Sequence, residues 1–497
     1  MKLAVSNDLM RRSDFAEIAA GTPSRVLMQR AGKAVSRCYP WKNGVVIVCG
    51  TGNNGGDGYV LAAELHQRGI ACRLVLLKSA FSADGLHFYE RCVAMGIPWE
   101  NYSAQTSFSD ASAIVDCLFG TGFRGNAEGD AAALICAINQ AKKPVISVDI
   151  NSGLCGDNGL GEPCVRADLT VAIGSYKYGH FLGRAKDVIK QLIGVDIGIP
   201  ILDEPVCHVT EHGDFHDVLA VREQLSHKGD YGYVGILGGC LEYSGAVKLA
   251  SMSCAALRAG CGVSALAVPK SLASAVVPYL LESTLALIPD DGEGNMIFDA
   301  EALEKFLHGK RAIAVGMGWG RAPHNEKILT YLLEHFEGAL VIDADGLNTL
   351  AKMDVSLLKR THAKVILTPH PKEFERLSGV SVNEILADPV GHARRYATEN
   401  GVCVLLKGAC TVVTDGMESY LVNRGCAGMA TAGSGDVLSG ILAGLLGYAP
   451  AAPHTVACAA HLNGLAGELA AYACNPTSMI ASDTVRQLPE AVSKMIS

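Results

Sequence analysis

The chain has 497 residues, a length that predicts about three ordinary domains or two large ones. Hydrophobic residues make up 49% of it and charged residues 19%, which excludes a mainly disordered protein. The formal net charge is −8 and the sequence contains no basic run, so a nucleic-acid partner is not expected.

The cysteines and the N-terminal residues predict where the protein works. Seventeen cysteines are scattered from Cys38 to Cys474 without a CxxC pair, which argues for reduced thiols and against a disulfide framework or a zinc cage. The first residues turn polar before any signal-type apolar region forms. The longest apolar stretch, residues 437–449, is too short to cross a bilayer. We therefore expect a soluble cytoplasmic protein without a membrane partner.

The first block of the chain alternates short β-branched runs with segments of helical period. This alternation predicts a mostly parallel sheet covered by helices. The predicted strands are Val45–Cys49, Cys72–Leu77, Ala113–Cys117, Val145–Asp149, Leu169–Ile173 and Ile193–Ile197. The predicted helices are about Asp8–Ala20, Ser24–Cys38 with Ser24 as its N-cap, Tyr59–Arg68 and Asp130–Ala141.

A second block of the same kind begins near Leu225. Its predicted strands are Tyr233–Leu237, Val263–Val268, Ala312–Val315, Leu340–Asp343, Lys364–Thr368 and Val402–Leu406. A hairpin of Thr411–Thr414 and Glu418–Val422 follows, and then two long helices, about Asp436–Leu446 and His454–Ala473. The segment Pro200–Gln224 has no clear period, so we predict two α/β domains, 1–212 and 218–497, with a boundary near residue 215.

A glycine-rich loop directly follows the first predicted strand. It reads Gly50-Thr51-Gly52-Asn53-Asn54-Gly55-Gly56-Asp57-Gly58 and contains GxGxxG. The next strand ends in Lys78-Ser79 without the acidic residue that holds a dinucleotide ribose, which disfavours an ordinary NAD-binding Rossmann site. A turn needed only for packing explains the glycines but not the polar side chains among them. We interpret the loop as a site for a phosphate-bearing or hydroxylated ligand.

Two further polar clusters end strands of this block. They read Asp116-Cys117-Leu118-Phe119-Gly120-Thr121-Gly122-Phe123-Arg124-Gly125 and Val148-Asp149-Ile150-Asn151-Ser152-Gly153-Leu154. A single acid at such a place is more often a cap or turn residue, but the repetition at three strand ends favours a site. Asn54, Asp116, Asp149 and Ser152 are expected to converge, because the carboxyl ends of parallel strands share one sheet edge. Such oxygens suit a hard cation better than zinc or copper.

In this order, after two N-terminal helices, GNNGGDG, DCLFGTG and VDxxSG resemble the epimerase domain of the NAD(P)H-hydrate repair enzymes. The resemblance covers most of residues 1–210. It implies a Rossmann-like three-layer domain that converts the R epimer of hydrated NADH or NADPH (NADHX, NADPHX) to the S epimer. By this resemblance Asp149 is the catalytic acid/base, and Asn54, Asp116 and Ser152 hold potassium. The implied hydrate-binding residues are Asn53, Asn54, Gly55, Gly56, Asp57, Gly120, Thr121, Gly122, Phe123, Arg124, Gly125, Asn126 and Asp149.

Two positions depart from this family's pattern. The family usually has proline at position 151, and Asn151 therefore predicts a less rigid loop without loss of a ligand. Gln29 stands where glutamate is usual, with only a modest local effect expected.

The second block carries its strongest motif at the start of an apolar helix. The motif reads Gly428-Met429-Ala430-Thr431-Ala432-Gly433-Ser434-Gly435-Asp436-Val437-Leu438. Backbone N–H groups at a helix N-terminus form an anion hole that glycines open to phosphates. In that positive field Asp436 can stay ionised and act as a base. The alternative, a turn with Asp436 as a helix-dipole partner only, does not explain the full Gly-x-Gly-Asp pattern.

Four other strand ends of this block agree with a nucleotide site. They are Lys407-Gly408-Ala409-Cys410-Thr411, Thr368-Pro369-His370-Pro371-Lys372-Glu373, Gly316-Met317-Gly318-Trp319-Gly320 and Asp343-Ala344-Asp345-Gly346-Leu347-Asn348. The lysine and the backbone amides after it suit a nucleotide phosphate, and the carboxylates suit a magnesium–nucleotide complex. A lone histidine is more often structural, but His370 is fixed between two prolines.

With His227-Lys228-Gly229-Asp230-Tyr231-Gly232 and Ser244-Gly245-Ala246, these motifs resemble the ADP/ATP-dependent NAD(P)H-hydrate dehydratase domain over nearly all of 225–497. The resemblance implies a ribokinase-like three-layer fold that removes the C6 hydroxyl of the S hydrate, with Mg²⁺ and ADP giving AMP and phosphate. Ala246, Gly318, His370 and Asp436 would face the hydrate, with Asp436 as the catalytic base. The implied nucleotide-binding residues are Lys407, Gly408, Ala409, Cys410, Thr411 and Gly435.

Two alternatives stay open on the sequence. One is a small-molecule kinase of the thiazole or pyrimidine alcohol type with an N-terminal ligand-binding module, against which TPHPKE and the fused first domain argue. The other is a first domain that only senses or binds a ligand, against which the intact Asp149 and Asn54 argue. A homo-oligomer is expected, although the residues do not give its size.

Overall fold

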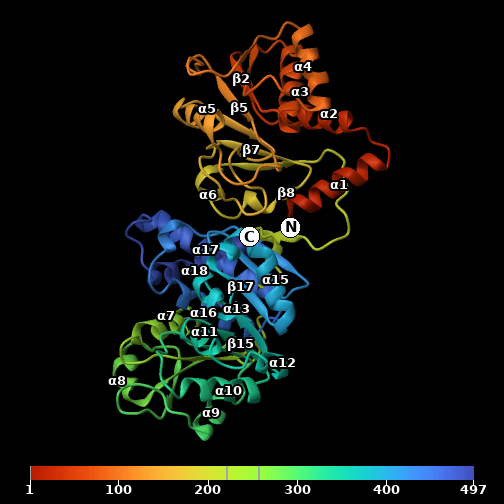
Figure 1. The fold of residues 1–497 in the computed structure, drawn as a ribbon. Coiled ribbons are helices and arrows are strands. Elements are labelled where there is room, and N and C mark those ends of the chain that lie inside the picture. Colours follow the sequence, from red (N-terminus) through yellow and green to blue (C-terminus); the bar gives the residue numbers. More distant parts are fainter. Residues whose placement is uncertain (1, 220–221, 256–257, 497) are drawn as a thin grey trace. The chain divides into compact units, whose positions relative to one another are not determined.

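The computed structural model describes residues 2–219, 222–255 and 258–496, which form two compact units (Figure 1). The first unit is Lys2–Cys207 and the second begins at His208. The boundary predicted from the sequence lies further along the chain, near residue 215, and residues 220–221 of the predicted irregular segment lie outside the described residues.

The first unit contains a parallel sheet in the order β4-β3-β2-β5-β6-β7-β9. Its strands are β2 (Val45–Cys49), β3 (Cys72–Leu76), β4 (Trp99–Asn101), β5 (Ala113–Cys117), β6 (Val145–Val148), β7 (Leu169–Ile173) and β9 (Leu192–Val195). A short parallel pairing joins β1 (Lys2–Val5) to β8 (Tyr176–Lys177). The helices are α1 (Asn7–Ala19), α2 (Ser24–Val35), α3 (Asn53–Gln67), α4 (Ala83–Ala94), α5 (Gly129–Gln140) and α6 (Ala185–Val188), with a 3-10 turn, η1 (Tyr178–His180).

The burial of β2 explains why this sheet is covered on both faces. All five of its side chains are buried. Val45 and Ile47 enter the core that α1–α4 cover, whereas Val46 and Val48 enter the core that α5 covers. A strand buried on both sides reads as an unbroken apolar run, which is how the sequence predicts it.

The second unit contains a larger sheet in the order β13-β12-β11-β14-β15-β16-β17-β18-β19-β10. It is parallel from β13 to β17, and β18 and β19 form the predicted antiparallel hairpin. The strands are β10 (Cys207–Val209), β11 (Tyr233–Leu237), β12 (Val263–Pro269), β13 (Thr284–Ile288), β14 (Ala312–Val315), β15 (Ala339–Ile342), β16 (Lys364–Leu367), β17 (Cys403–Leu406), β18 (Thr411–Thr414) and β19 (Ser419–Val422).

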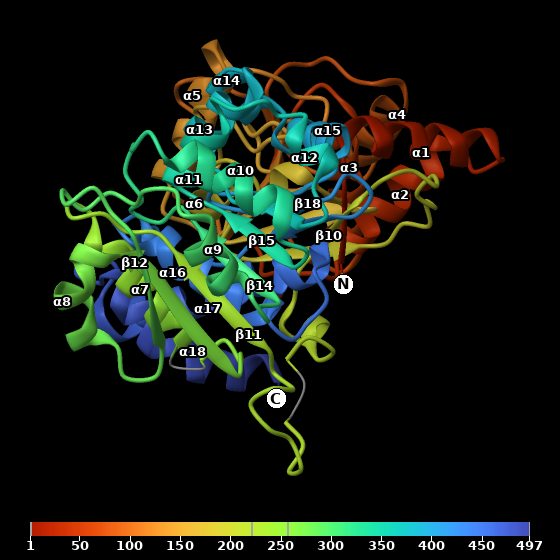
Figure 2. The same cartoon turned by 90° about the horizontal axis from the view of Figure 1, so that it is seen from below.

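Helices cover both faces of this sheet, α9–α11 and α13 on one side and α7, α16, α17 and α18 on the other (Figure 2). The helices are α7 (Ser244–Ala255), α8 (Ala273–Val276), α9 (Ala300–Leu307), α10 (Asn325–His335), α11 (Asp345–Leu350), α12 (Leu357–Arg360), α13 (Pro371–Ser378), α14 (Val382–Ala387), α15 (Pro389–Asn400), α16 (Ser434–Leu446), α17 (Pro453–Cys474) and α18 (Ala481–Ile496). The 3-10 turns are η2 (His212–Phe215), η3 (Lys270–Leu272), η4 (Val277–Tyr279) and η5 (Ala427–Met429).

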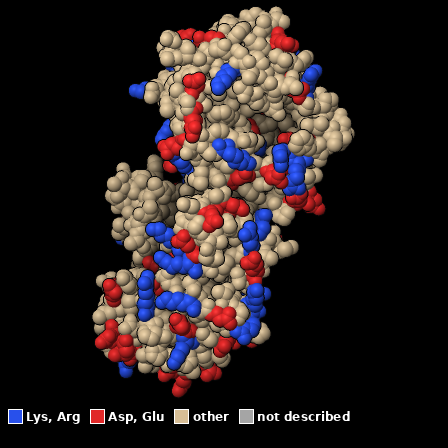
Figure 3. Space-filling model, viewed as in Figure 1, with Lys and Arg blue, Asp and Glu red and all other residues tan. Residues whose placement is uncertain are grey.

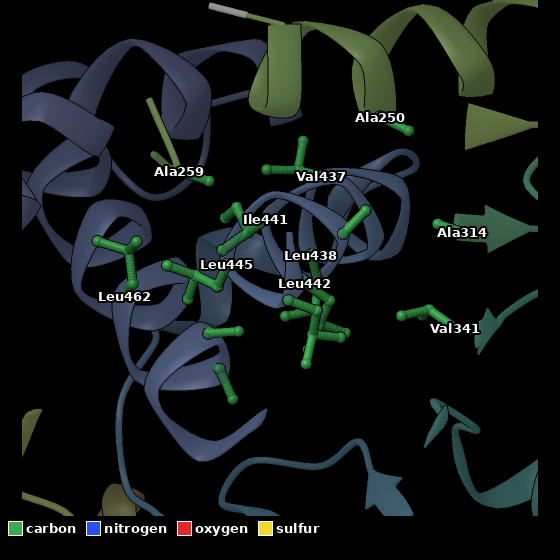
Figure 4. Close-up of a cluster of buried hydrophobic side chains, with 14 of the residues drawn as sticks. Ala250, Ala259, Ala314, Val341, Val437, Leu438, Ile441, Leu442, Leu445 and Leu462 are labelled. Atoms are coloured by element: carbon green, nitrogen blue, oxygen red, sulfur yellow. The ribbon is translucent and has the colours of Figure 1, made fainter. Parts of the chain in front are cut away.

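Helix α16 is apolar around most of its circumference because it is packed on several sides. Its side chains meet Ala250 of α7, Ala314 of β14 and Val341 of β15 (Figure 4). The buried α16 side chains in this cluster are Val437, Leu438, Ile441, Leu442 and Leu445. This packing fixes the direction of the helix and therefore the position of its N-terminal turn, which carries Asp436.

The structure corrects one predicted helix cap and adds strands. The N-cap of α2 is Pro23, and Ser24 lies inside the helix with its hydroxyl donating to Asp84. Strands β1, β4, β8, β10 and β13 were not predicted, and all but β13 are too short to show a clear alternation. Among the helices of the described residues, none is both long enough and apolar enough to cross a membrane.

We expect the two units to fold independently, because each has its own sheet and its own apolar cores. Residues 1–204 and 205–497, expressed separately, should each give a cooperative urea transition and the circular dichroism of a mixed α/β fold. This cut keeps β10 with its partner β19, and it keeps Glu204 with Arg12. A half that stays unfolded or aggregated in isolation would contradict the expectation.

Candidate active sites

The first unit has a cavity of about 880 Å³ at the carboxyl ends of β2, β5 and β6. Figure 3 shows a hollow on this unit with side chains of both charges around it. Of the predicted ligand-binding residues, those that line the cavity are Asn53, Asn54, Asp57, Gly120, Thr121, Gly122, Phe123, Arg124 and Asp149. Gly55, Gly56, Gly125 and Asn126 are not among its lining residues. A Cβ at Gly55 would lie 2.2 Å from the carbonyl oxygen of Gly50, so this glycine permits a close backbone approach beneath the cavity.

Asp149 follows β6 in a left-handed backbone conformation, with φ of 65°. Such strain in a non-glycine residue is characteristic of functional sites. The ammonium of Lys177 lies 2.6 Å from Oδ1, and the backbone N–H of Thr121 donates to Oδ2 at 3.3 Å. Burial alone would raise the Asp149 pKa, but Lys177 outweighs burial and holds the pKa below its ordinary value. Asp149 is therefore an ionised carboxylate inside the protein.

His180 fixes the backbone around this carboxylate. Its Nδ1 accepts a hydrogen bond from the backbone N–H of Lys177 at 2.9 Å, so its Nε2 carries the proton and donates to the carbonyl oxygen of Asp149 at 2.6 Å. Burial, followed by the charge of Lys177, lowers the His180 pKa to about 4, and the ring is neutral at pH 7. His180 thus positions Asp149 without adding charge.

Asp116 is a fully buried carboxylate near the end of β5 and does not itself line the cavity. Its Oδ1 accepts from the Ser152 hydroxyl at 2.5 Å, and its Oδ2 accepts from the Ser147 hydroxyl at 2.8 Å and from the backbone of Ser152 at 2.9 Å. Burial raises the pKa of Asp116, and its hydrogen bonds only partly offset this. The amide nitrogen of Asn54 donates to the Phe119 carbonyl at 2.8 Å, while the buried Asn54 Oδ1 has no hydrogen-bond partner among the described residues.

The loop that contains Asn151 is more constrained than the sequence predicts. The Asn151 amide donates to the carbonyls of Val165 at 2.9 Å and Val188 at 3.0 Å, and its oxygen accepts from the Thr170 hydroxyl at 2.5 Å. These three buried bonds hold the loop where the family usually has proline, so the expectation of a looser loop is wrong.

In the second unit, Asp436 lies in the first turn of α16, after Gly433 with φ of 92°. Burial and then the charge of Asp343 raise the Asp436 pKa to about 7, and Lys407 partly opposes this rise. A carboxyl group with that pKa exchanges protons near neutral pH, as a general base requires.

Lys407, which the sequence predicts at a nucleotide phosphate, turns toward carboxylates of the neighbouring strand ends. Its ammonium lies 2.8 Å from Oδ1 of Asp343 and 3.8 Å from Oε2 of Glu373. The Ser439 hydroxyl donates to the other Asp343 oxygen at 2.7 Å. Burial works against the ionised form of both partners, but their attraction prevails, lowering the Asp343 pKa and raising the Lys407 pKa.

Gly435 brings the α16 turn onto this ion pair. A Cβ at Gly435 would lie 3.5 Å from both the Lys407 ammonium and Asp343 Oδ2. The structure therefore brings Asp436, Gly435 and Lys407 together. The backbones of Gly408 and Ala409 are exposed, Cys410 is buried and Thr411 begins β18.

The remaining predicted residues lie on neighbouring strand ends. A Cβ at Gly318 would lie 2.9 Å from the Cβ of Ala246, so these two predicted residues are adjacent. His370 caps α13, and its Nε2 lies 3.3 Å from Oε1 of Glu373, which in turn faces Lys407. Burial, followed by the charge of Lys407, lowers the His370 pKa.

Sequence reasoning missed Lys177 and His180 and gave Asp343 only a general role. One signal for Lys177 exists, because no other Asp, Glu, Lys or Arg lies between Leu169 and Gly183. A charged residue in such a buried stretch normally has a partner. Its partner, Asp149, lies 28 residues earlier in the sequence, and local spacing does not reveal this contact.

Both halves of the chain match known families. The family described as NAD(P)H-hydrate dehydratase matches residues 234–490, and the family described as YjeF-related protein N-terminus matches residues 24–179. The bifunctional NAD(P)H-hydrate repair enzyme of Moorella thermoacetica is 35% identical, with 94% of this chain and 92% of the relative covered. That of Escherichia coli is 32% identical, with 98% and 93% covered. The crystal structure of the ADP/ATP-dependent NAD(P)H-hydrate dehydratase of Bacillus subtilis, co-crystallised with ATP and Mg²⁺, is similar with a TM-score of 0.50 and 26% identity, covering 59% of this chain and 99% of that one.

The Lys177–Asp149 pair predicts a pH-dependent loss of stability when the cation is removed. Lys177→Met leaves a buried carboxylate unpaired and should lower the free energy of unfolding of the first unit by about 3–5 kcal/mol at pH 7. In the wild type the Asp149 pKa is lowered, so the pair stabilises above the ordinary carboxyl pKa and this contribution is lost as pH falls. The deficit of the variant should therefore shrink at acidic pH, where Asp149 can take up a proton.

The matched control is Lys190→Met. Lys190 is 75% exposed and lies 3.4 Å from Asp168, and such a surface pair contributes less than about 1 kcal/mol. Urea unfolding from pH 4 to pH 8 makes the comparison. Equal deficits for the two variants, or a Lys177→Met deficit independent of pH, would contradict the assigned pairing.

Proposed function

The chain belongs to the bifunctional NAD(P)H-hydrate repair enzymes, with an epimerase domain and a dehydratase domain, and we propose which of its residues perform the two reactions. Membership across nearly the whole chain removes the kinase alternative, since the second domain matches the NAD(P)H-hydrate dehydratase family and the relatives that cover both domains are repair enzymes. We assign the epimerase activity to the first unit, Lys2–Cys207, and the dehydratase activity to the unit that begins at His208. The observation that carries the assignment is a pair of partly buried carboxylates, Asp149 directly after β6 in the first unit and Asp436 in the first turn of α16 in the second.

In the first unit, we propose that Asp149 moves the proton during epimerisation at C6 of the hydrated nicotinamide. Its carboxylate lines the cavity, is held ionised by Lys177, and is oriented by His180. Asn53, Asp57 and the Gly120–Arg124 segment line the same cavity and would hold the rest of the dinucleotide. Arg124 already pairs with Asp157 at 2.9 Å and remains half exposed, which suits contact with a phosphate.

Potassium is the proposed cation of this site. The unpartnered Asn54 Oδ1 offers a free oxygen, and Asp116 is a buried carboxylate with no lysine or arginine partner among the described residues. Ser152 hydrogen-bonds to Asp116 and completes an all-oxygen set of hard donors. A bound potassium ion would place a positive charge beside the buried Asp116 carboxylate. It would also hold the Gly120 loop next to Asp149.

We propose that the dehydratase unit uses ADP, with Mg²⁺, and releases AMP and phosphate. The B. subtilis relative is named as ADP/ATP-dependent and was crystallised with ATP and Mg²⁺. Asp345 would supply a hard oxygen of the kind that Mg²⁺ prefers, which leaves Asp436 free to act as the base. Asp436 would remove the proton from the C6 hydroxyl of the S hydrate as that oxygen attacks the terminal phosphoryl group of ADP. Phosphate is then a far better leaving group than hydroxide, and loss of the C5 proton restores the C5=C6 double bond.

Two further proposals concern the setting of the enzyme. Each cysteine whose side chain is described is free, which supports a reducing compartment such as the cytoplasm. A homo-oligomer, expected from the sequence, remains a proposal that mass measurement in solution would test. The small-molecule substrates are NADHX, NADPHX and ADP.

Removing the proposed potassium ligand should affect one activity only. Asp116→Ala should slow epimerisation of the R hydrate and abolish its response to potassium, and dehydration of pure S hydrate should continue at the wild-type rate. Asp116→Asn, which keeps the shape of the side chain, guards against misfolding. The cation assignment would be wrong if the wild-type enzyme epimerised at equal rates in potassium, in sodium and without added cation.

Asp436→Asn should remove the base of the dehydratase while preserving its shape. Loss of a general base costs on the order of 10²–10⁴ in rate, and the loss should fall on kcat more than on ADP affinity. Because the Asp436 pKa is about 7, wild-type dehydration should rise with pH through that value, and the variant should lack this rise. Steady-state assays of NADH formation measure both effects.

The control for this variant is Glu337→Gln, an exposed carboxyl on the same unit, which should leave the rate and the pH profile unchanged. Epimerisation should continue in Asp436→Asn, so the R and S hydrates would equilibrate without repair. A fully active Asp436→Asn dehydratase would leave Asp436 as a helix-terminus residue only.

A further inference from the structure

Helix α1 brings an additional carboxyl group to the epimerase cavity. Asp14 and four other α1 residues line that cavity, Met10, Arg11, Phe15 and Ile18. Asp14 is half-buried, and its carboxyl has no hydrogen bond or ion pair among the described residues. The mechanism above does not use it.

Three contacts fix α1 beside the reacting carboxylate. The preceding strand β1 pairs with β8, where Val5 is the register partner of Lys177. Asn7 then donates to Asp157 at 2.7 Å through its backbone and to the carbonyl of Thr121 at 2.9 Å through its side chain. Thr121 is the residue whose N–H contacts Asp149. Asp14 is therefore held on the α1 wall of a cavity whose strand-end wall carries Asp149.

The charges around the cavity leave Asp14 without a counter-ion. The other charged lining residues are Arg11, Asp57, Asp84, Arg124, Asp149 and Lys177. Arg11 pairs with Asp8, Arg124 with Asp157, and Lys177 with Asp149. Asp84 pairs with Arg25, and Asp57, in the first turns of α3, belongs with the glycine loop at the strand-end wall.

The surroundings tune Asp14 for proton exchange. Burial, opposed by Lys177 and reinforced by Asp149, raises the Asp14 pKa to about 6, whereas the Asp149 pKa is lowered. Two carboxyl groups with separated pKa values in one cavity are the arrangement of an acid and a base.

We propose that Asp14 is a second catalytic residue of the epimerase and exchanges a proton with the C6 oxygen from the α1 side, while Asp149 acts from the strand-end side. This inference rests on the proposed epimerase function. Epimerisation inverts the configuration at C6, so one oxygen leaves from one face and another arrives at the opposite face. Two proton-transfer groups on different walls of the cavity can serve these two faces.

The step balances without an oxidant or a reductant. In the R hydrate the C6–O bond breaks, and its electron pair leaves with oxygen, which takes the Asp14 proton and departs as water. The N1 lone pair forms a C6=N1 double bond. Water then attacks C6 from the opposite face, the π pair returns to N1, and Asp149 takes the proton of the incoming water. Solvent returns the proton to Asp14.

The test is the pH profile of epimerisation by the full-length protein, with purified R hydrate of NADH as the probe. In the wild type, kcat/KM should fall as pH rises through about 6, because Asp14 loses its proton. Asp14→Asn should lower kcat on the order of 10²–10⁴-fold, with KM little changed, and should abolish this fall. Asp14→Glu should restore part of the rate and of the pH limb. In ¹⁸O-water, each wild-type turnover should place one ¹⁸O atom at C6.

Two controls separate failure of the inference from failure of the function. Glu17→Gln changes a carboxyl on the same helix that does not line the cavity, and it should behave as wild type. Dehydration of pure S hydrate reports on the fold of every variant. If Asp14→Asn keeps the wild-type rate, keeps the pH limb at a lower rate, or changes only KM, or if the product lacks ¹⁸O, the inference is overturned. If the wild type does not epimerise the R hydrate at all, the proposed epimerase function itself falls.

Discussion

One interaction recurs in both units, a buried aspartate compensated by one lysine from another strand end. In the first unit the pair is Asp149 with Lys177, at 2.6 Å, and in the second it is Asp343 with Lys407, at 2.8 Å. An isolated carboxylate inside the protein would take up a proton or destabilise the fold. Each lysine therefore allows its aspartate to stay ionised in the site. The positions of the remaining acids then decide the chemistry.

The two pairs are used differently. In the first unit the paired Asp149 itself faces the cavity, and its neighbours Asp14 and Asp57 carry raised pKa values. In the second unit the paired Asp343 is tied up by Lys407 and Ser439, and the adjacent Asp436 has the pKa near 7. Both proposed reactions therefore depend on the same feature, a lysine–aspartate ion pair beside further acids. Epimerisation would use two acids around one carbon, and dehydration would use one base beside a phosphate.

The sequence predicts the scaffold of these sites better than their internal contacts. Strands such as Val45–Cys49 and Ala113–Cys117 are buried on both faces, and their apolar runs are visible in the sequence. The loops that follow these strands could be assigned to one sheet edge, because the carboxyl ends of parallel strands lie along the same edge. Lys177 could not be assigned to Asp149, because the contact depends on how β8 and its turn pack after the sheet is formed.

Other contacts escaped prediction because they depend on side-chain direction. Lys407 turns inward to Asp343 instead of standing alone at the nucleotide loop, which no spacing rule indicates. Asn151 constrains its loop through three hydrogen bonds to partners 14, 19 and 37 residues away. Asp14 looks like an ordinary polar residue of an N-terminal helix until β1 and Asn7 fix that helix against the cavity.

We infer that two self-contained sites, each built around its own acids, carry out the repair in sequence. The most direct test mixes two single-site variants, Asp149→Asn and Asp436→Asn. The substrate is hydrated NADH with equal amounts of the R and S epimers, and ADP is present in excess. Alone, the first variant should restore only the S fraction as NADH absorbance, and the second should restore none. Together they should restore the whole. A mixture that stops at the S fraction, or an Asp149→Asn variant that repairs both epimers at the wild-type rate, would contradict the account.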